Sequence, residues 1–256
     1  MGKRIFLNRL FISCLCLALI FTGKGYASDW DIKSDYSQYY SVNTLRRAAP
    51  LFGLAAAGAH SGLDMQIRHG YQSLRGPSGD QVSSWCKQPG EGKLLIPAAL
   101  LTASLQLFSD DESILSPVTQ WGQRVTRSYL VGAPPLLLMQ RFTGGSRPGE
   151  TDDGAQWRPM QDANGVSGHA FMGAVPFLVL GNLQESSWVK AVALFASALP
   201  AWSRVHDDKH FLSQAVLGWS MAKWAVDAVT GSYKPNPDVY ITPAGRRWVL
   251  GVNWCW

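Results

Sequence analysis

The chain has 256 residues, enough for one substantial hydrophobic core or a small pair of domains. Its formal net charge of +5 falls to +1 once residues 1–27 are set aside, because that segment holds four basic residues and no acidic one. A chain this close to neutrality gives no basis for a nucleic-acid partner.

Residues 1–27 are typical of a secretory signal peptide. Basic residues lie near the start, residues 10–22 form an uncharged and mostly apolar run, and residues 25–27 form a small-x-small cleavage signal. The sequence therefore predicts export to the periplasm or cell envelope, with a mature chain that begins at Ser28. Of four cysteines, only Cys86 and Cys255 remain after cleavage, which favours a disulfide over two free thiols.

The first part of the mature chain is predicted to be helical with two exceptions. Residues 28–42 are polar and aromatic and predict a surface lead-in, and residues 68–92 are rich in Gly, Ser and charge and predict irregular structure. Helices are expected where apolar residues dominate, at Leu45–Gly58, Leu94–Phe108 and Ser116–Met139, the last strained or kinked at Pro134-Pro135.

Residues 143–168 contain six glycines and show neither a helical nor a strand period. A long loop inside a compact domain is usually functional or disordered, and candidate site residues at both ends favour a functional loop. Helices are predicted after it, at His169–Leu183, Ser187–Trp202 and Phe211–Val229. His210 is placed with Gln214, Leu217 and Met221 on one helical face.

The tail changes character, because residues 239–242 and 246–254 read as two strands around a turn. We therefore expect three parts: a signal peptide at 1–27, a helical domain at 28–235 and a β-hairpin tail at 236–256. The longest uncharged runs of the mature chain have 16 residues, and a membrane-spanning helix needs about 20. Buried helices of a soluble bundle fit better, although tilted spans with charged ends remain open.

Three short stretches supply the parts of a phosphate site. They are Gln140–Pro148, Ser167-Gly168-His169, and Ser203-Arg204 with His210 six residues after the arginine. Arg147 and Arg204 each offer a planar guanidinium that stays charged and bonds two oxygens at once. Ser167 offers a hydroxyl and Gly168 a backbone N–H at the start of a helix, where the helix dipole favours anions.

The two histidines suit the two roles that phosphoryl transfer requires. We expect His210, predicted to lie one turn into a helix, to attack phosphorus as a neutral imidazole. His169, at a helix start, suits general acid and base catalysis. Each stretch alone is weak, since a histidine at a helix start is more often a cap or a surface residue. The three together, in this order, favour a phosphate site.

These stretches resemble those of the type 2 phosphatidic acid phosphatase (PAP2) superfamily, which includes bacterial non-specific acid phosphatases, lipid phosphate phosphatases and vanadium haloperoxidases. The family pattern is Lys-x6-Arg-Pro, Pro-Ser-Gly-His and Ser-Arg-x5-His-x3-Asp. The resemblance covers about residues 90 to 230 and implies an all-α, PAP2-like helical bundle, here with a short C-terminal β-hairpin. It also implies a phosphohistidine mechanism that uses no metal and no cofactor.

The chain departs from that pattern at three positions. Gln140 stands where the family has lysine, Val166 replaces the proline before Ser-Gly-His, and Gln214 replaces the aspartate that holds the nucleophilic histidine. A glutamine oxygen can accept the same hydrogen bond but cannot supply the negative charge, so a reduced rate is expected. Asp207 and Asp208 lie close enough in sequence to compensate, or are simply solvated charges.

The resemblance implies a phosphatase that acts on a phosphomonoester or diphosphate, a lipid phosphate or another small phosphoester. The abundant tryptophans suit contact with a membrane surface, or ordinary core packing. A phosphate-lipid binding protein with weakened catalysis and a lipid phosphotransferase remain alternatives. The sequence does not determine the oligomeric state.

Overall fold

The structure, a computed structural model, describes residues 30–108, 114–150, 152 and 154–231, together with the backbone of strands at 238–244 and 247–253. The described elements follow one another along the chain as α2 (Ile32–Tyr39), α3 (Val42–His60), α4 (Leu63–Gln72), α5 (Pro77–Cys86), η1 (Gln88–Glu91), α6 (Leu95–Ser104), η2 (Leu105–Phe108), α7 (Ser116–Thr143), α8 (Gly168–Asn182), α9 (Ser187–His206), α10 (Leu212–Thr230), β1 (Asp238–Ala244) and β2 (Arg247–Asn253).

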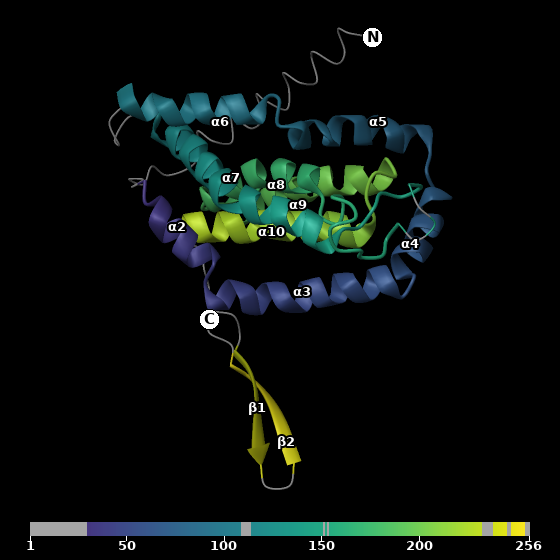
Figure 1. The fold of residues 1–256 in the computed structure, drawn as a ribbon. Helices are drawn as coiled ribbons and strands as arrows, with labels where there is room; N and C mark the ends of the chain where they lie inside the picture. The colour runs from purple at the N-terminus through teal and green to yellow at the C-terminus, as the bar shows by residue number, and fades with distance from the viewer. Residues whose placement is uncertain are drawn as a thin grey trace.

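Helices α7, α8, α9 and α10 form the centre of the bundle (Figure 1). Helices α5 and α6 lie along one side of this centre and α3 along the other, while α4 closes one end between α3 and α5. The core is apolar where α8 meets α7 and α10. Phe171, Val175 and Leu217 are fully buried there, as are Val125 and Val131 of α7. This burial is the main stabilising contribution to the fold.

In α7 and α8, a carbonyl that loses its usual helical donor to an interior proline accepts from a hydroxyl of a neighbouring helix. Pro134 deprives the Leu130 carbonyl, which accepts instead from the Tyr36 hydroxyl of α2 at 2.9 Å. In α8, Pro176 deprives the Met172 carbonyl, which accepts from the Tyr129 hydroxyl of α7 at 2.7 Å. Pro134 and Pro176 are therefore accommodated by hydroxyl donors from neighbouring helices.

The prediction of a helical protein is confirmed, and so are the helices expected from apolar patterns at 45–58, 94–108, 116–139, 169–183, 187–202 and 211–229. Two predictions were wrong. Within the segment 28–42, expected to be a surface lead-in, residues 32–39 form α2 and Val42 begins α3, with Asp35 and Tyr39 buried. Residues 68–92, expected to be irregular, form the end of α4, then α5 and η1.

These errors have a physical cause. Helices α2 and α4 bury polar side chains, Asp35 and Asp64, against polar partners, so they lack the apolar period on which the prediction relied. Helix α5 begins with Pro77 directly after Gly76, a start signal that was available in the sequence.

Strands β1 and β2 pair antiparallel, with Asp238 opposite Asn253 and Ala244 opposite Arg247. The predicted signal peptide and Cys255 lie outside the described residues. Within the part of the chain that is described, no helix is both long enough and apolar enough to cross a membrane.

Candidate active site

The loop between α7 and α8 is held by two glutamine side chains. Gln140 Nε2 donates to the Val166 carbonyl at 2.9 Å, and Gln214 Nε2 donates to the Ser146 carbonyl at 2.9 Å. Gln214 also accepts through its backbone carbonyl from Ser167 N at 2.9 Å. Two neutral amides, at the positions where the PAP2 pattern has lysine and aspartate, therefore anchor the loop.

Ser167, Gly168 and His169 lie at the start of α8, as the sequence predicts. Ser167 is the N-cap, and its Oγ accepts from Ala170 N at 3.3 Å. The first backbone N–H groups of a helix have no intrahelical acceptor, so Gly168 and His169 present donors at the positive end of the α8 dipole. Gly218 of α10 permits close packing here, because a Cβ on it would lie 2.2 Å from the Ser167 carbonyl oxygen.

Arg204, in the last turn of α9, is the cation that most clearly lacks a partner. Its Nε is buried, and no acceptor within the described residues lies at hydrogen-bonding distance. Its nearest carboxylate oxygen, on Asp207, is 4.0 Å from Nη1. A buried guanidinium N–H without an acceptor is costly, and an anion held at this position would satisfy it.

Arg147 lies in the loop and is oriented by its neighbours. Its Nε donates to Asn164 Oδ1 at 3.0 Å, and its backbone N–H donates to Glu150 Oε2 at 2.9 Å. Its charge reaches the other site residues, because it lowers the pKa of both His169 and His210. Arg147 and Arg204 therefore act electrostatically on the same two imidazoles.

His210 is buried, and its orientation is determined by Gln214. His210 Nδ1 lies 3.0 Å from Gln214 Oε1, which also accepts from Phe211 N at 3.2 Å. Since Gln214 Nε2 donates to a carbonyl, its oxygen must face His210, and Nδ1 of the neutral imidazole must carry the hydrogen. This arrangement leaves the lone pair of Nε2 as the nucleophile.

The position of His210 differs from the prediction in one respect. His210 precedes α10, whose N-cap is Phe211, instead of lying one turn inside the helix. The N-cap, Phe211, has an extended backbone with φ of −69° and ψ of 161°, so the helical conformation begins at Leu212. Gln214, Leu217 and Met221 lie on α10 at the expected spacing, and all three are buried, as is His210.

The pKa of both imidazoles lies below its usual value. Burial lowers the pKa of His210 from 6.5 to about 4, with further lowering by Arg204, Arg147 and His169 and an opposing effect from the hydrogen bond to Gln214. Burial also lowers the pKa of His169, as do Arg204 and Arg147, while Glu91 opposes them. A neutral imidazole is the form that attacks phosphorus. Arg147 and Arg204 lie within electrostatic range of both histidines.

Sequence reasoning missed the contribution of η1. Gly90 packs against α8 so closely that a Cβ on it would lie 2.6 Å from the His169 carbonyl oxygen. Glu91 thereby comes near enough to raise the pKa of His169, and Lys87 near enough to lower it. No pattern local to η1 signals this, because the approach depends on tertiary packing.

The two aspartates that the sequence offered as substitutes for the missing carboxylate have other partners. Asp207 accepts a hydrogen bond from Ser83, and Asp208 accepts two from Arg68.

The low pKa of His210 predicts a specific loss of stability in acid. Above pH 6.5 the imidazole is neutral in both the folded and the unfolded chain and contributes no pH dependence. Between pH 6.5 and about 4 the unfolded chain binds a proton that the folded chain does not, so stability falls as pH falls, by roughly 3 kcal/mol across this window. Urea unfolding at pH 7 and pH 4.5 measures the effect.

A His210→Gln variant should lack this component while retaining the rest of the acid sensitivity. Subtracting its pH dependence from that of the wild type isolates the contribution of His210. Identical pH dependence in the two proteins would contradict the buried, neutral state of the imidazole.

Comparison with known proteins gives a family match and a similar solved structure. Residues 129–233 match the family model of the PAP2 superfamily. The fold is similar to that of the first transmembrane PAP2 type phosphatidylglycerolphosphate phosphatase from Bacillus subtilis, with a TM-score of 0.56 and 17% sequence identity, over 75% of this chain and 96% of that chain. Among curated proteins no match is found. The predicted resemblance to the PAP2 superfamily is therefore confirmed, over a segment, residues 129–233, that contains both arginines and both histidines of the site.

Proposed function

We propose that this protein is a phosphatase that hydrolyses a phosphomonoester or diphosphate, specifically a lipid phosphate, through a phosphohistidine at His210. The observation that carries the proposal is the buried, unpartnered Nε of Arg204, close enough to His169 and His210 to lower the pKa of both. A tetrahedral oxyanion supplies the acceptor that this donor lacks and the negative charge that the two arginines favour.

In the first step the phosphoryl group is held by Arg147, Arg204 and the N–H groups at the start of α8. Nε2 of His210 attacks phosphorus, the bond to the leaving oxygen breaks, and His169, once protonated, gives its proton to that oxygen. The bound phosphate anion favours protonation of His169, adding to the effect of Glu91. Gln214 holds the Nδ1–H of His210 throughout.

In the second step a water molecule replaces the alcohol. His169, now neutral, takes a proton from the water as its oxygen attacks the phosphohistidine, the N–P bond breaks, and inorganic phosphate leaves with His210 restored. Every proton is accounted for by His169 and water, and the step draws on no metal or cofactor.

A lipid substrate is favoured by the apolar side chains that lie around the site. Phe142 at the end of α7 and Met160 in the loop are 60% and 71% exposed, and residue 160 is tied to α7 by its N–H bond to the Arg141 carbonyl. Leu212 and Val216, one turn apart at the start of α10, are also exposed. Such side chains suit acyl chains or a membrane surface in the cell envelope.

The test is phosphate release by purified protein in detergent micelles, with phosphatidate, phosphatidylglycerophosphate and an isoprenyl diphosphate as substrates. We expect inorganic phosphate from at least one of them, and added acceptor alcohols separate hydrolysis from phosphotransfer. A Gln140→Lys/Gln214→Asp variant is the matched control. If neither protein releases phosphate, the phosphatase proposal fails.

Phosphate-lipid binding that survives His210→Ala, with no turnover by the wild type, would support a binding protein instead. The neutral Gln214 gives this alternative a specific basis, since it cannot stabilise the positive charge that develops on His210.

Gln214→Glu is expected to increase turnover, because glutamate is isosteric and adds a carboxylate beside His210 Nδ1. The charge should raise the pKa of His210 by 1 to 3 units, which is the usual order of magnitude for a close opposite charge, and increase kcat by roughly 10-fold or more. The loss of the donor to the Ser146 carbonyl acts against this gain. The pH–rate profile and kcat decide the result, and an unchanged profile would contradict the proposed role of Gln214.

A further inference from the structure

Helix α4 presents four polar side chains on one face towards the segment that joins α9 to α10. Asp64, Arg68, Tyr71 and Gln72 follow the spacing of successive helical turns, and we call them the α4 face. Helix α4 lies outside the segment that matches the PAP2 superfamily. Its polar contacts fall on Trp202, Val205, His206, Asp208 and Ser213, and the segment they span also contains Arg204 and His210.

The α4 face satisfies both helix ends at this junction. Gln72 Nε2 donates to the Val205 carbonyl at 2.9 Å and to the His206 carbonyl at 3.4 Å, which are among the last carbonyls of α9. Asp64 Oδ1 accepts from Ser213 N at 3.1 Å, and its other oxygen accepts from the Ser213 hydroxyl. Asp64 therefore caps α10 from another helix, where its charge also favours the helix dipole.

Between these ends, Arg68 holds the connection itself. Its Nε and Nη2 donate to the two carboxylate oxygens of Asp208, each at 2.7 Å, and this pairing lowers the pKa of Asp208. Asp208 is one of two described non-glycine residues with positive φ. A left-handed conformation is unfavourable for such a residue, so the two-point ion pair helps to maintain it.

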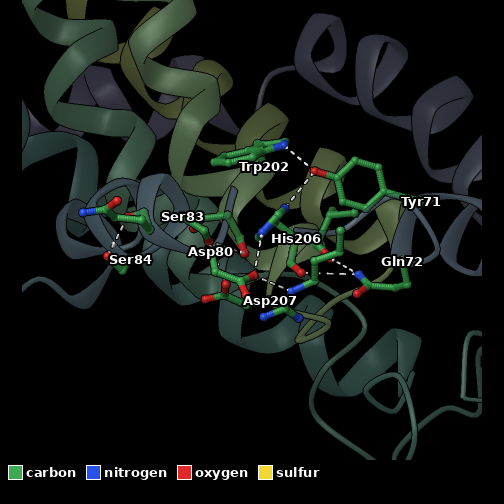
Figure 2. A network of polar contacts seen from close by, with 12 residues as sticks. Tyr71, Gln72, Asp80, Ser83, Ser84, Trp202, His206 and Asp207 are labelled. Carbon is green, nitrogen blue, oxygen red and sulfur yellow. Dashed lines mark hydrogen bonds and ion pairs between the residues drawn. The ribbon is translucent and has the colours of Figure 1, made fainter. Parts of the chain in front are cut away.

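A second network fixes the end of α9 (Figure 2). The Tyr71 hydroxyl lies 3.0 Å from His206 Nδ1 and accepts from Trp202 Nε1 at 2.8 Å. On its other side, His206 Nε2 lies 3.0 Å from Asp80 Oδ1 of α5. The last turn of α9, which carries Arg204, is therefore held from both α4 and α5.

The backbone transmits this restraint to the nucleophile. The Arg204 carbonyl accepts from Lys209 N at 2.9 Å and from His210 N at 3.2 Å, so the backbone positions of Arg204 and His210 are coupled. The reacting atoms of an enzyme must lie within a narrow range of positions, and a displacement of about 1 Å can cost 10²-fold in rate.

We propose that the α4 face is a positioning element for the active site, with the Arg68–Asp208 pair setting the placement of His210 relative to Arg204. This inference rests on the proposed function for its kinetic consequences. Its structural consequence, an ordered connection that holds an oxyanion, can be tested without turnover.

The experiment compares Arg68→Ala, Arg68→Lys, Asp208→Asn and the Arg68→Ala/Asp208→Asn double variant with the wild type. Lysine keeps the charge without the two-point contact, and asparagine tolerates a left-handed backbone while removing the charge. Lys223→Ala is the control, since it breaks an ion pair to buried Asp227 on α10, about 15 Å further along the helix than Ser213. Each protein is measured for lipid-phosphate hydrolysis, inorganic phosphate affinity, hydrogen exchange at 207–211 and urea unfolding.

We expect Arg68→Ala to lower kcat by roughly 10- to 10²-fold, weaken phosphate binding and accelerate exchange at 207–211. Arg68→Lys should recover part of each loss, and the double variant should be no worse than Arg68→Ala alone. Lys223→Ala should lose stability without these changes. If losses in activity and affinity merely follow stability in all variants, including Lys223→Ala, the α4 face is only structural and the proposal is overturned.

If neither the wild type nor Gln140→Lys/Gln214→Asp hydrolyses any substrate, the proposed function fails, while phosphate affinity and exchange still decide the positioning role. Unchanged affinity and exchange in Arg68→Ala would then overturn it.

Discussion

Replacing His210 with alanine is expected to lower kcat by at least about 10⁴-fold, because the variant has no nucleophile to form the covalent intermediate. The fold should survive, since Gln214 keeps its bonds to Phe211 N and to the Ser146 carbonyl. Steady-state hydrolysis of the best lipid phosphate measures the effect.

His60→Ala, which removes an exposed imidazole from α3, is the control and should behave as the wild type. A loss of less than 10-fold in His210→Ala would show that water attacks the phosphoryl group directly, which would refute the assignment of His210 as nucleophile.

The second large effect concerns the pair between Arg127 of α7 and Asp35 of α2. The guanidinium donates to both carboxylate oxygens, at 2.6 and 2.7 Å, and the side chains are only 8% and 2% exposed. Arg127→Ala leaves a buried carboxylate without its partner, so we expect a loss of roughly 3–5 kcal/mol in the free energy of unfolding, measured in urea.

An Arg127→Met/Asp35→Leu double variant should recover much of this loss, because it removes both buried charges together. Lys93→Ala, which breaks an exposed pair with Glu91, should cost less than about 1 kcal/mol. If Arg127→Ala were no more destabilising than Lys93→Ala, the described burial of the pair would be wrong.

The sequence predicted the fold wherever apolar residues set the pattern. Helices α8 and α10 were readable because Ser167 marks the start of one and Gly231, with φ of 64°, the end of the other. Helix α4 was not readable, since the residues it buries are polar and their partners lie more than 130 positions away along the chain. Non-local polar pairing of this kind leaves no local period.

In the candidate site, too, local patterns were readable from the sequence and non-local polar contacts were not. Motif spacing and the family resemblance indicated Arg147, His169, Arg204 and His210 as site residues. In the structure these residues lie within electrostatic range of one another. The orientation of the Gln214 amide was left open by the sequence, because it depends on the Ser146 carbonyl of a distant loop. The role of residues 28–235 as a catalytic domain, the site assignments and export remain predictions.

The most direct test of the account is to trap the covalent intermediate. The protein is mixed with a ³²P-labelled substrate, quenched within the first turnover and denatured, and the label on the chain is tested for the stability in alkali and lability in acid that mark a phosphohistidine. We predict label of this kind on the wild type and none on His210→Ala. Equal labelling of both proteins, or phosphate release by the wild type with no labelled chain at any time, would contradict a phosphohistidine at His210.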